Sequence, residues 1–176
     1  CHIIPGHPIA GTEFSGSKNA KIDLFKNKWC ILTPSKVSKD QVNKVKDLWE
    51  LVGMKVSVMA SDEHDRIMSV TSHLPHLIAF TIVGTAFKFD LKEKKKVVNF
   101  SAGGFRDFTR IASSDPEMWK DIFLHNRKNI IGTLDAFIED LEKFKILIKK
   151  KKTMEIKTLI KKTKNIRKGV LNLKQN

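Results

Sequence analysis

Three short runs of this 176-residue sequence combine histidine, arginine or acidic side chains with glycine or proline. They are His7-Pro8-Ile9-Ala10-Gly11-Thr12-Glu13, Ser72-His73-Leu74-Pro75-His76 and Ala102-Gly103-Gly104-Phe105-Arg106-Asp107-Phe108-Thr109-Arg110. Glycine and proline give the backbone special geometry, and the polar side chains beside them can transfer protons or bind anions. We interpret the three runs as three walls of one pocket.

The first candidate is His7, which lies between Gly6 and Pro8 and is followed by Gly11. A histidine in a loop after a strand can reach into the crevice at the carboxyl ends of the strands of an α/β sheet. Its ordinary pKa of about 6.5 suits proton transfer at neutral pH. The alternative is a surface-loop histidine with no chemical role, and the sequence leaves both open.

The second pair of candidates, His73 and His76, would share one face of a helix because they are three residues apart. They could bind a metal ion, orient a carboxylate substrate or pack between helices. His64-Asp65 raises the alternative of a metal-dependent hydrolase. On a continuous helix, however, His64 would lie about 13 Å from His73, at ~1.5 Å per residue. A metal ion needs three or four ligands around it, so we expect no metal.

The third run carries Arg106 and Arg110, with Asp107 between them. Arginine stays charged and binds a carboxylate through two parallel hydrogen bonds. A turn at Gly103-Gly104 that leads into an arginine-bearing helical turn is therefore typical of a carboxylate clamp. An ordinary helical pair between Asp107 and Arg110 is the alternative, and both hold if Asp107 keeps Arg110 in place.

Other catalytic signatures do not occur in this sequence. It contains neither Gly-x-Gly-x-x-Gly nor a P-loop, and no Ser-His-Asp or Cys-His arrangement indicates a nucleophile. Two cysteines, Cys1 and Cys30, are too few for a disulfide framework, so we expect a cytoplasmic protein. The chain begins in mid-pattern with Cys1 rather than Met and shows no signal peptide. We expect a fragment that lacks its N-terminal part.

Composition and charge favour a globular protein, with 41% apolar and 8% aromatic residues. No apolar run approaches the roughly 20 residues that span a bilayer, so we expect no membrane partner. Of the net charge of +14, the segment Glu142–Asn176 carries +11, from 13 Lys and Arg against 2 Asp and Glu. This segment has one arginine and one aromatic residue, whereas base recognition favours both, so we expect no nucleic-acid partner.

The elements that must position the candidate residues follow from apolar periodicity. Residues 1–12 predict a strand end and a loop, and the apolar runs 29–33 and 56–59 predict two strands. Between these runs, Ser38 and Gln41 have capping-box spacing, and a helical pattern continues to Gly53. Strand, helix and strand with short connections predict an α/β layer.

The remainder of the chain has helical periodicity. One helix is predicted from Asp62 to about Phe87, and Pro75 predicts a kink within it. Another begins at the Asp115-Pro116 cap and extends to Phe144, about 45 Å at ~1.5 Å per residue. Because such a long helix usually packs along a partner, we expect a dimer. The segment Ile156–Val170 predicts a last, basic amphipathic helix.

Taken in order, the three runs resemble the prephenate/arogenate dehydrogenase family of tyrosine biosynthesis over roughly residues 2–135. The match continues in Ser15-Gly16, Leu32-Thr33-Pro34, His64-Asp65, Ile111-Ala112, Pro116, Met118-Trp119 and Asn126. Several motifs in one order are far more specific than any single motif. The lysine-rich tail matches the family only in being helical.

The resemblance implies the C-terminal part of a Rossmann domain in residues 1–60 and an all-α dimerisation and substrate domain in residues 61–176. The glycine-rich dinucleotide loop would lie upstream of Cys1. The cofactor, NAD or NADP with NAD favoured, would be bound mainly by that missing segment. The chain would form a homodimer and carry the substrate half of the site, inactive as this fragment alone.

The resemblance also implies an oxidative decarboxylation of prephenate to 4-hydroxyphenylpyruvate, or of arogenate to tyrosine. The substrate hydroxyl becomes a carbonyl as hydride leaves, and the ring carboxylate departs as carbon dioxide. His7 would deprotonate that hydroxyl, and Arg110 would bind a substrate carboxylate. His76 would contact the substrate side chain, with His73 beside it.

Further implied roles concern the rim of the pocket. Gly103 and Trp119 would line it, from this subunit or its neighbour, and Glu13 and Asp107 would form an ionic gate with Arg110. Two other functions stay as alternatives: a non-catalytic helical dimerisation or binding module, and the less favoured His-Asp metal-dependent hydrolase.

Overall fold

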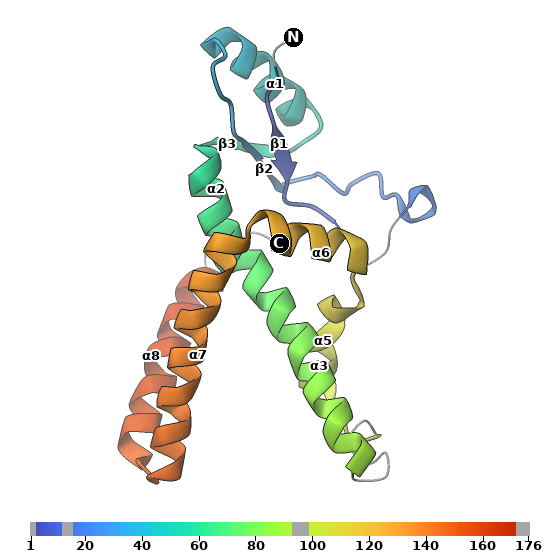
Figure 1. Cartoon of the computed structure of the whole chain (residues 1–176). Coiled ribbons are helices and arrows are strands. Elements are labelled where there is room, and N and C mark those ends of the chain that lie inside the picture. Colours follow the sequence, from blue (N-terminus) through green and yellow to red (C-terminus); the bar gives the residue numbers. More distant parts are fainter. Residues whose placement is uncertain (1–2, 12–15, 93–98, 172–176) are drawn as a thin grey trace.

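The computed structural model describes residues 3–11, 16–92 and 99–171 of the chain. Figure 1 shows two parts, a small layer of strands with helix α1 (Lys39–Leu51) at one end and a set of long helices extending from it. The α/β remnant followed by a helical domain is therefore present, as the sequence predicts.

In the described part of the chain, one sheet contains strands β1 (Gly6–Pro8), β2 (Trp29–Leu32) and β3 (Lys55–Val58), in that order. β2 and β3 are parallel and α1 connects them, since parallel strands need a crossover. β1 is antiparallel to β2 and pairs His7 with Ile31. The expected loop position of His7 is wrong: the ladder continues through Pro8, which an edge strand tolerates.

The core of this layer is small and lies between the sheet and α1. Cys30, Leu32 and Met54 are buried there, and Trp49 and Phe25 pack against them. The predicted capping box of α1 is present, with the Gln41 N–H donating to Ser38 Oγ at 3.3 Å and the Ser38 N–H donating to Gln41 Oε1 at 2.9 Å. Gly53, with φ of 88°, follows α1 as predicted.

A single helical path leads from the sheet into the helical domain (Figure 1) and carries three of the six histidines of the sequence. It consists of α2 (Ser61–Met68), a π-helical turn at Ser69–His73 and α3 (Leu74–Lys92). The predicted break near Pro75 is confirmed, because proline has no N–H to donate and its ring crowds the carbonyl four residues earlier. The π-helical turn ends at His73, and His76 follows Pro75 in the first turn of α3.

This path also corrects the expectation about apolar runs. The helix Ser61–Phe89 is long and apolar enough to cross a membrane, by length and composition only. Its outer surface exposes large side chains such as Ile82, Val83 and Phe87. Exposed apolar side chains in this number usually mark an interaction surface that another molecule buries.

The Gly103-Gly104 pair does not form the expected tight turn. Both glycines belong to the first turn of α5 (Gly103–Thr109), and neither has a positive φ. Ala102 is extended and accepts the first helical hydrogen bonds, from the N–H groups of Phe105 and Arg106. The glycines are tolerated there because the first N–H groups of a helix have no helical partner.

The expected single helix from 116 to 144 is likewise wrong. The structure has α6 (Pro116–His125) and α7 (Arg127–Lys149), with Asn126 at φ −99° and ψ 24° between them. The Asp115 cap is as predicted and accepts from the Met118 N–H at 2.8 Å. The break exists because the buried Asn126 amide donates to the Asp65 carbonyl at 2.8 Å and so bonds outside its own helix.

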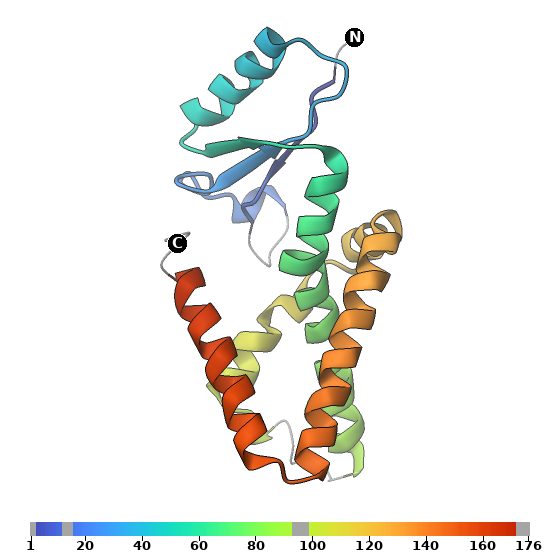
Figure 2. The ribbon, with the colours of Figure 1, turned by 90° about the vertical axis from the view of Figure 1, so that its left-hand side faces the viewer.

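The last helix, α8 (Thr153–Leu171), contacts α7 and runs back in the opposite direction (Figure 2). It matches the predicted basic helix. Ile138 and Leu141 on α7 and Ile160 and Ile166 on α8 are exposed, so these helices also present apolar surface outward.

Replacement of Asn126 by alanine tests its role at the helix junction. Asn126→Ala removes a buried amide that bonds the Asp65 carbonyl and the His73 ring, and we expect the free energy of unfolding to fall by about 1–3 kcal/mol. Asn43→Ala, at an exposed position on α1, is the matched control, with an expected change within about 0.5 kcal/mol. Chemical denaturation measures both, and equal stability of the two variants would contradict this role.

Candidate functional site

An open cavity of about 990 Å³ lies where the sheet layer meets the helices. Its lining includes five of the residues that the sequence singled out: His7, His73, His76, Arg110 and Trp119. They come from β1, the π-helical turn, α3, the 3-10 turn Arg110–Ser113 and α6. Elements that are far apart in the sequence therefore line the same cavity.

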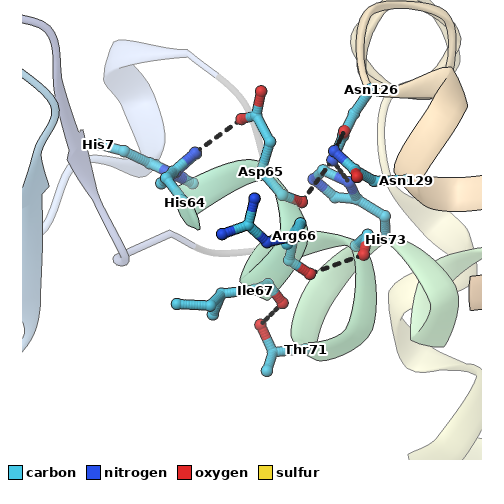
Figure 3. A network of polar contacts seen from close by, with 10 residues as sticks. His7, His64, Asp65, Arg66, Ile67, Thr71, His73, Asn126 and Asn129 are labelled. Atoms are coloured by element: carbon cyan, nitrogen blue, oxygen red, sulfur yellow. Dashed lines mark hydrogen bonds and ion pairs between the residues drawn. The ribbon is translucent and has the colours of Figure 1, made fainter. Parts of the chain in front are cut away.

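His7 is bonded to a second histidine that sequence reasoning did not assign to it. His7 Nδ1 lies 2.8 Å from His64 Nε2, and His64 Nδ1 lies 2.9 Å from Asp65 Oδ1 (Figure 3). From the sequence, the position of His64 could be compared only with that of His73 along a helix. Its actual partner stands on β1, 57 positions earlier, and only the packing of α2 against the sheet reveals it.

The environment of His7 favours its neutral form. His7 reaches solvent at the mouth of the cavity, yet enough protein surrounds the ring that burial lowers its pKa, and the neighbouring His64 lowers the pKa further. A neutral imidazole at neutral pH has a lone pair available to accept a proton.

His76 and Trp119 form the aromatic side of the cavity. Their rings stack with centroids 3.7 Å apart and planes at 23°. His76 Nδ1 lies 2.9 Å from the Ser72 carbonyl oxygen, which can only accept, so Nδ1 carries the proton. Burial lowers the His76 pKa most; the bond to Ser72 opposes this, and the Arg110 charge lowers the pKa further.

His73 is held by Asn126. The Asn126 amide nitrogen lies 3.2 Å from His73 Nδ1, and Asn129 donates to the Asn126 side-chain oxygen at 2.8 Å, which fixes the amide orientation. His73 Nδ1 therefore accepts, and its Nε2 carries the proton. Burial lowers the His73 pKa most, Asp65 raises it, and the nearby histidines lower it.

The other predicted site residues lie elsewhere. Gly103 and Asp107 are exposed on α5 and do not line the cavity in this chain, and Glu13 lies outside the described residues. Their roles at the rim stay predictions. Arg106 is also exposed on α5, one helical turn before Arg110.

The His-Asp pair does not assemble a metal site in the described part of the chain. Among those residues, no group of three or more His, Cys, Asp or Glu could hold a metal ion. His64 and Asp65 instead bond to each other and to His7.

Two family models match the chain. The model described as "Prephenate dehydrogenase, nucleotide-binding domain" matches residues 1–58. The model described as "Prephenate dehydrogenase, dimerization domain" matches residues 60–162.

Curated relatives of this chain carry related names. A cyclohexadienyl dehydrogenase from Zymomonas mobilis is 39% identical over 147 residues, which cover 83% of this chain and 50% of the relative. A prephenate dehydrogenase from Bacillus subtilis is 38% identical over 169 residues, which cover 96% and 45%. The chain thus spans about half the length of the curated relatives it matches.

Solved structures share the fold. Prephenate dehydrogenase from Aquifex aeolicus, in complex with hydroxyphenyl propionate and NAD+, has a TM-score of 0.88 at 40% identity and covers 95% of this chain and 58% of that one. Arogenate dehydrogenase from Synechocystis has a TM-score of 0.82 at 25% identity, with coverage of 96% and 62%.

The lowered pKa values predict an acid-sensitive fold. Between about pH 7.5 and 5.5, unfolded histidines take up protons near their ordinary pKa of about 6.5, whereas His7, His73 and His76 resist protonation in the fold. Stability is therefore full above pH 6.5 and falls with acidification. We expect a lower thermal unfolding midpoint at pH 5.5, followed by circular dichroism, and a weaker pH dependence in His76→Asn. A midpoint that rises on acidification would contradict this.

Proposed function

The chain belongs to the prephenate dehydrogenase family, and from this premise we propose that it forms the substrate half of an NAD(P)-dependent enzyme that oxidatively decarboxylates prephenate or arogenate. One observation carries the proposal: His7 and Arg110, a neutral base and a permanent cation, line the same cavity although about a hundred positions separate them. Residues 1–60 would belong to the nucleotide-binding domain, and residues 61–176 to the helical domain.

The cavity suits a small anionic ring. Arg110 offers a charge for a carboxylate, and the stacked His76 and Trp119 offer a flat aromatic wall. The Trp119 indole N–H is buried and has no acceptor among the described residues. A buried donor without a partner costs about 1–3 kcal/mol. An oxygen could pair with it only after the side chains that cover it shift. The hydroxyphenyl propionate of the Aquifex complex combines a ring, a hydroxyl and a carboxylate in the same way.

In the proposed reaction, this chain supplies a general base and a cation that binds the substrate carboxylate. A nicotinamide cofactor, when bound, supplies an acceptor for the hydride on the hydroxyl-bearing carbon. His7 takes the hydroxyl proton as that carbon becomes a carbonyl. Arg110 holds a substrate carboxylate, and His76, with His73 beside it, meets the substrate side chain. Loss of the ring carboxylate as carbon dioxide then completes the aromatic ring.

The residues present fit the substrate side of this reaction better than the cofactor side. Residues 1–58 match the nucleotide-binding family model, but the sequence has no Gly-x-Gly-x-x-Gly loop to hold a diphosphate. That contact would come from outside this sequence. Between the two cofactors we favour NAD, since the Aquifex neighbour contains NAD+.

The proposed assembly is a homodimer in the cytoplasm. The matched dimerisation model covers residues 60–162, and exposed apolar side chains lie on α3, α7 and α8 within and beside this range. A second copy packed on these helices would bury that surface, including the apolar face of the helix Ser61–Phe89.

Replacement of the proposed base is the direct test. In the full-length protein, His7→Asn keeps a polar side chain but cannot accept the proton, and we expect kcat to fall about 10²–10⁴-fold with KM nearly unchanged. NAD(P)H formation with prephenate and with arogenate measures both constants. Near-normal turnover of His7→Asn would refute the base, and no turnover of either substrate by the wild-type protein would favour the non-catalytic binding module.

Replacement of the proposed clamp tests substrate binding. Arg110→Gln removes the charge, and we expect KM to rise about 10–100-fold, a larger change than in kcat. Arg106→Gln is the matched control, because Arg106 is exposed and does not line the cavity. Initial-rate kinetics of both variants separate the two arginines, and an equal rise in KM would contradict the assignment.

A further inference from the structure

We infer that His64 and Asp65 are positioning residues for His7, which set the protonation pattern of its ring and balance the charge that forms on it. The catalytic consequence rests on the proposed function. The hydrogen-bond order within the trio does not, and it can be tested without substrate.

The order of the hydrogen bonds follows from the acceptor at one end. The Asp65 carboxylate can only accept, so His64 Nδ1, 2.9 Å away, must carry a proton. In a neutral His64 the other nitrogen, Nε2, is then an acceptor. His7 Nδ1, at 2.8 Å from it, must donate. The lone pair of His7 therefore lies on Nε2, the nitrogen left for a substrate proton.

The environment of His64 and Asp65 maintains this order of hydrogen bonds. The His64 side chain is 17% exposed and the Asp65 side chain 47% exposed. All three residues line the cavity. The Asp65 backbone is held separately, because its carbonyl accepts from Asn126, which is buried between α6 and α7 (Figure 3). A residue fixed at its backbone can hold its carboxylate at a constant distance from His64.

The proposed step needs a counter-charge near His7. When the substrate O–H bond breaks, its electrons form the carbonyl, hydride passes to the nicotinamide cofactor, and the proton binds His7 Nε2. The resulting imidazolium shares its Nδ1 proton with His64, and the Asp65 carboxylate offsets the positive charge. The proton returns to solvent through the open cavity after the product leaves.

Other titratable or charged groups line this cavity, and they contribute to the pH dependence of kcat. They are His73 and His76 from the middle of the helical path, Arg110 from the 3-10 turn, and His125 from α6. Asp65 reaches His7 through His64. Because Asp65 also raises the His73 pKa, the pH profile of an Asp65 variant includes His73, and the tautomer of His7 is the readout specific to His7.

The variant Asp65→Asn, made in the full-length protein, tests whether Asp65 positions His7 or only stabilises the fold. Its amide can donate to His64 Nδ1, which reverses the order and leaves a proton on His7 Nε2. We expect kcat at pH 7 to fall about 10–1000-fold while KM changes less than about threefold. The acid limb of the kcat–pH profile should also move to lower pH, because the lost carboxylate favoured the protonated ring. A purely structural defect would leave that limb in place.

Asp62→Asn is the matched control, since Asp62 is exposed in the first turn of the same helix and does not line the cavity. We expect its kcat to stay within about twofold of wild type. His64→Gln serves as the second variant if Asp65→Asn fails to fold. Its amide oxygen can still accept from His7 but has no link to the carboxylate, so kcat should fall while the protein keeps its thermal midpoint.

A substrate-free readout distinguishes failure of this inference from failure of the proposed function. Nitrogen NMR of labelled histidines should show the His7 proton on Nδ1 in the wild-type protein and on Nε2 in Asp65→Asn. That result supports the positioning role even if prephenate and arogenate prove not to be substrates. An unchanged His7 tautomer, or normal kcat in Asp65→Asn and in His64→Gln, would overturn it.

Discussion

The contact on which this site depends is the hydrogen bond between His7 of β1 and His64 of α2, because it joins the sheet layer to the helical domain. His7 alone is an exposed residue on an edge strand whose neighbour is proline. Bonded to His64, it has one defined ring orientation at the mouth of the cavity. The helical domain thus controls a side chain that the sheet supplies, and the geometry of His7 depends on how the two parts pack.

The helical path that starts at α2 positions the other histidines of the cavity as well. Pro75 prevents a continuous α-helix, and the π-helical turn before it adds local width, so His64, His73 and His76 all line one cavity. Asn126 connects this path to the junction of α6 and α7 through the Asp65 carbonyl and His73. Because Trp119 precedes that junction on α6, the stacking of Trp119 on His76 depends on the same junction.

Local signals in the sequence predicted the elements well, and long-range contacts explain the misses. The capping box at Ser38, the Asp115 cap and the break near Pro75 depend on residues within one helical turn, and all three are present. The break at Asn126 depends on a hydrogen bond to a residue 61 positions away, which periodicity cannot show. The role of His64 depends on the same kind of contact, because its partner His7 lies across the packed interface with β1 and not along the helix.

The cavity is lined by two chemically different kinds of basic side chain, the guanidinium of Arg110 and several imidazoles. A guanidinium group keeps its charge around neutral pH, so an arginine such as Arg110 can bind an anion without acting as a base. The imidazoles of His7, His73 and His76 have lowered pKa values, chiefly because burial penalises their charged forms. If they were charged at neutral pH, they would bind an anionic ring tightly in its ground state but leave no base for the reaction. In the proposed function, Arg110 would supply the affinity for an anion and His7 the proton transfer, and the burial that lowers the pKa of His7 would serve that second role.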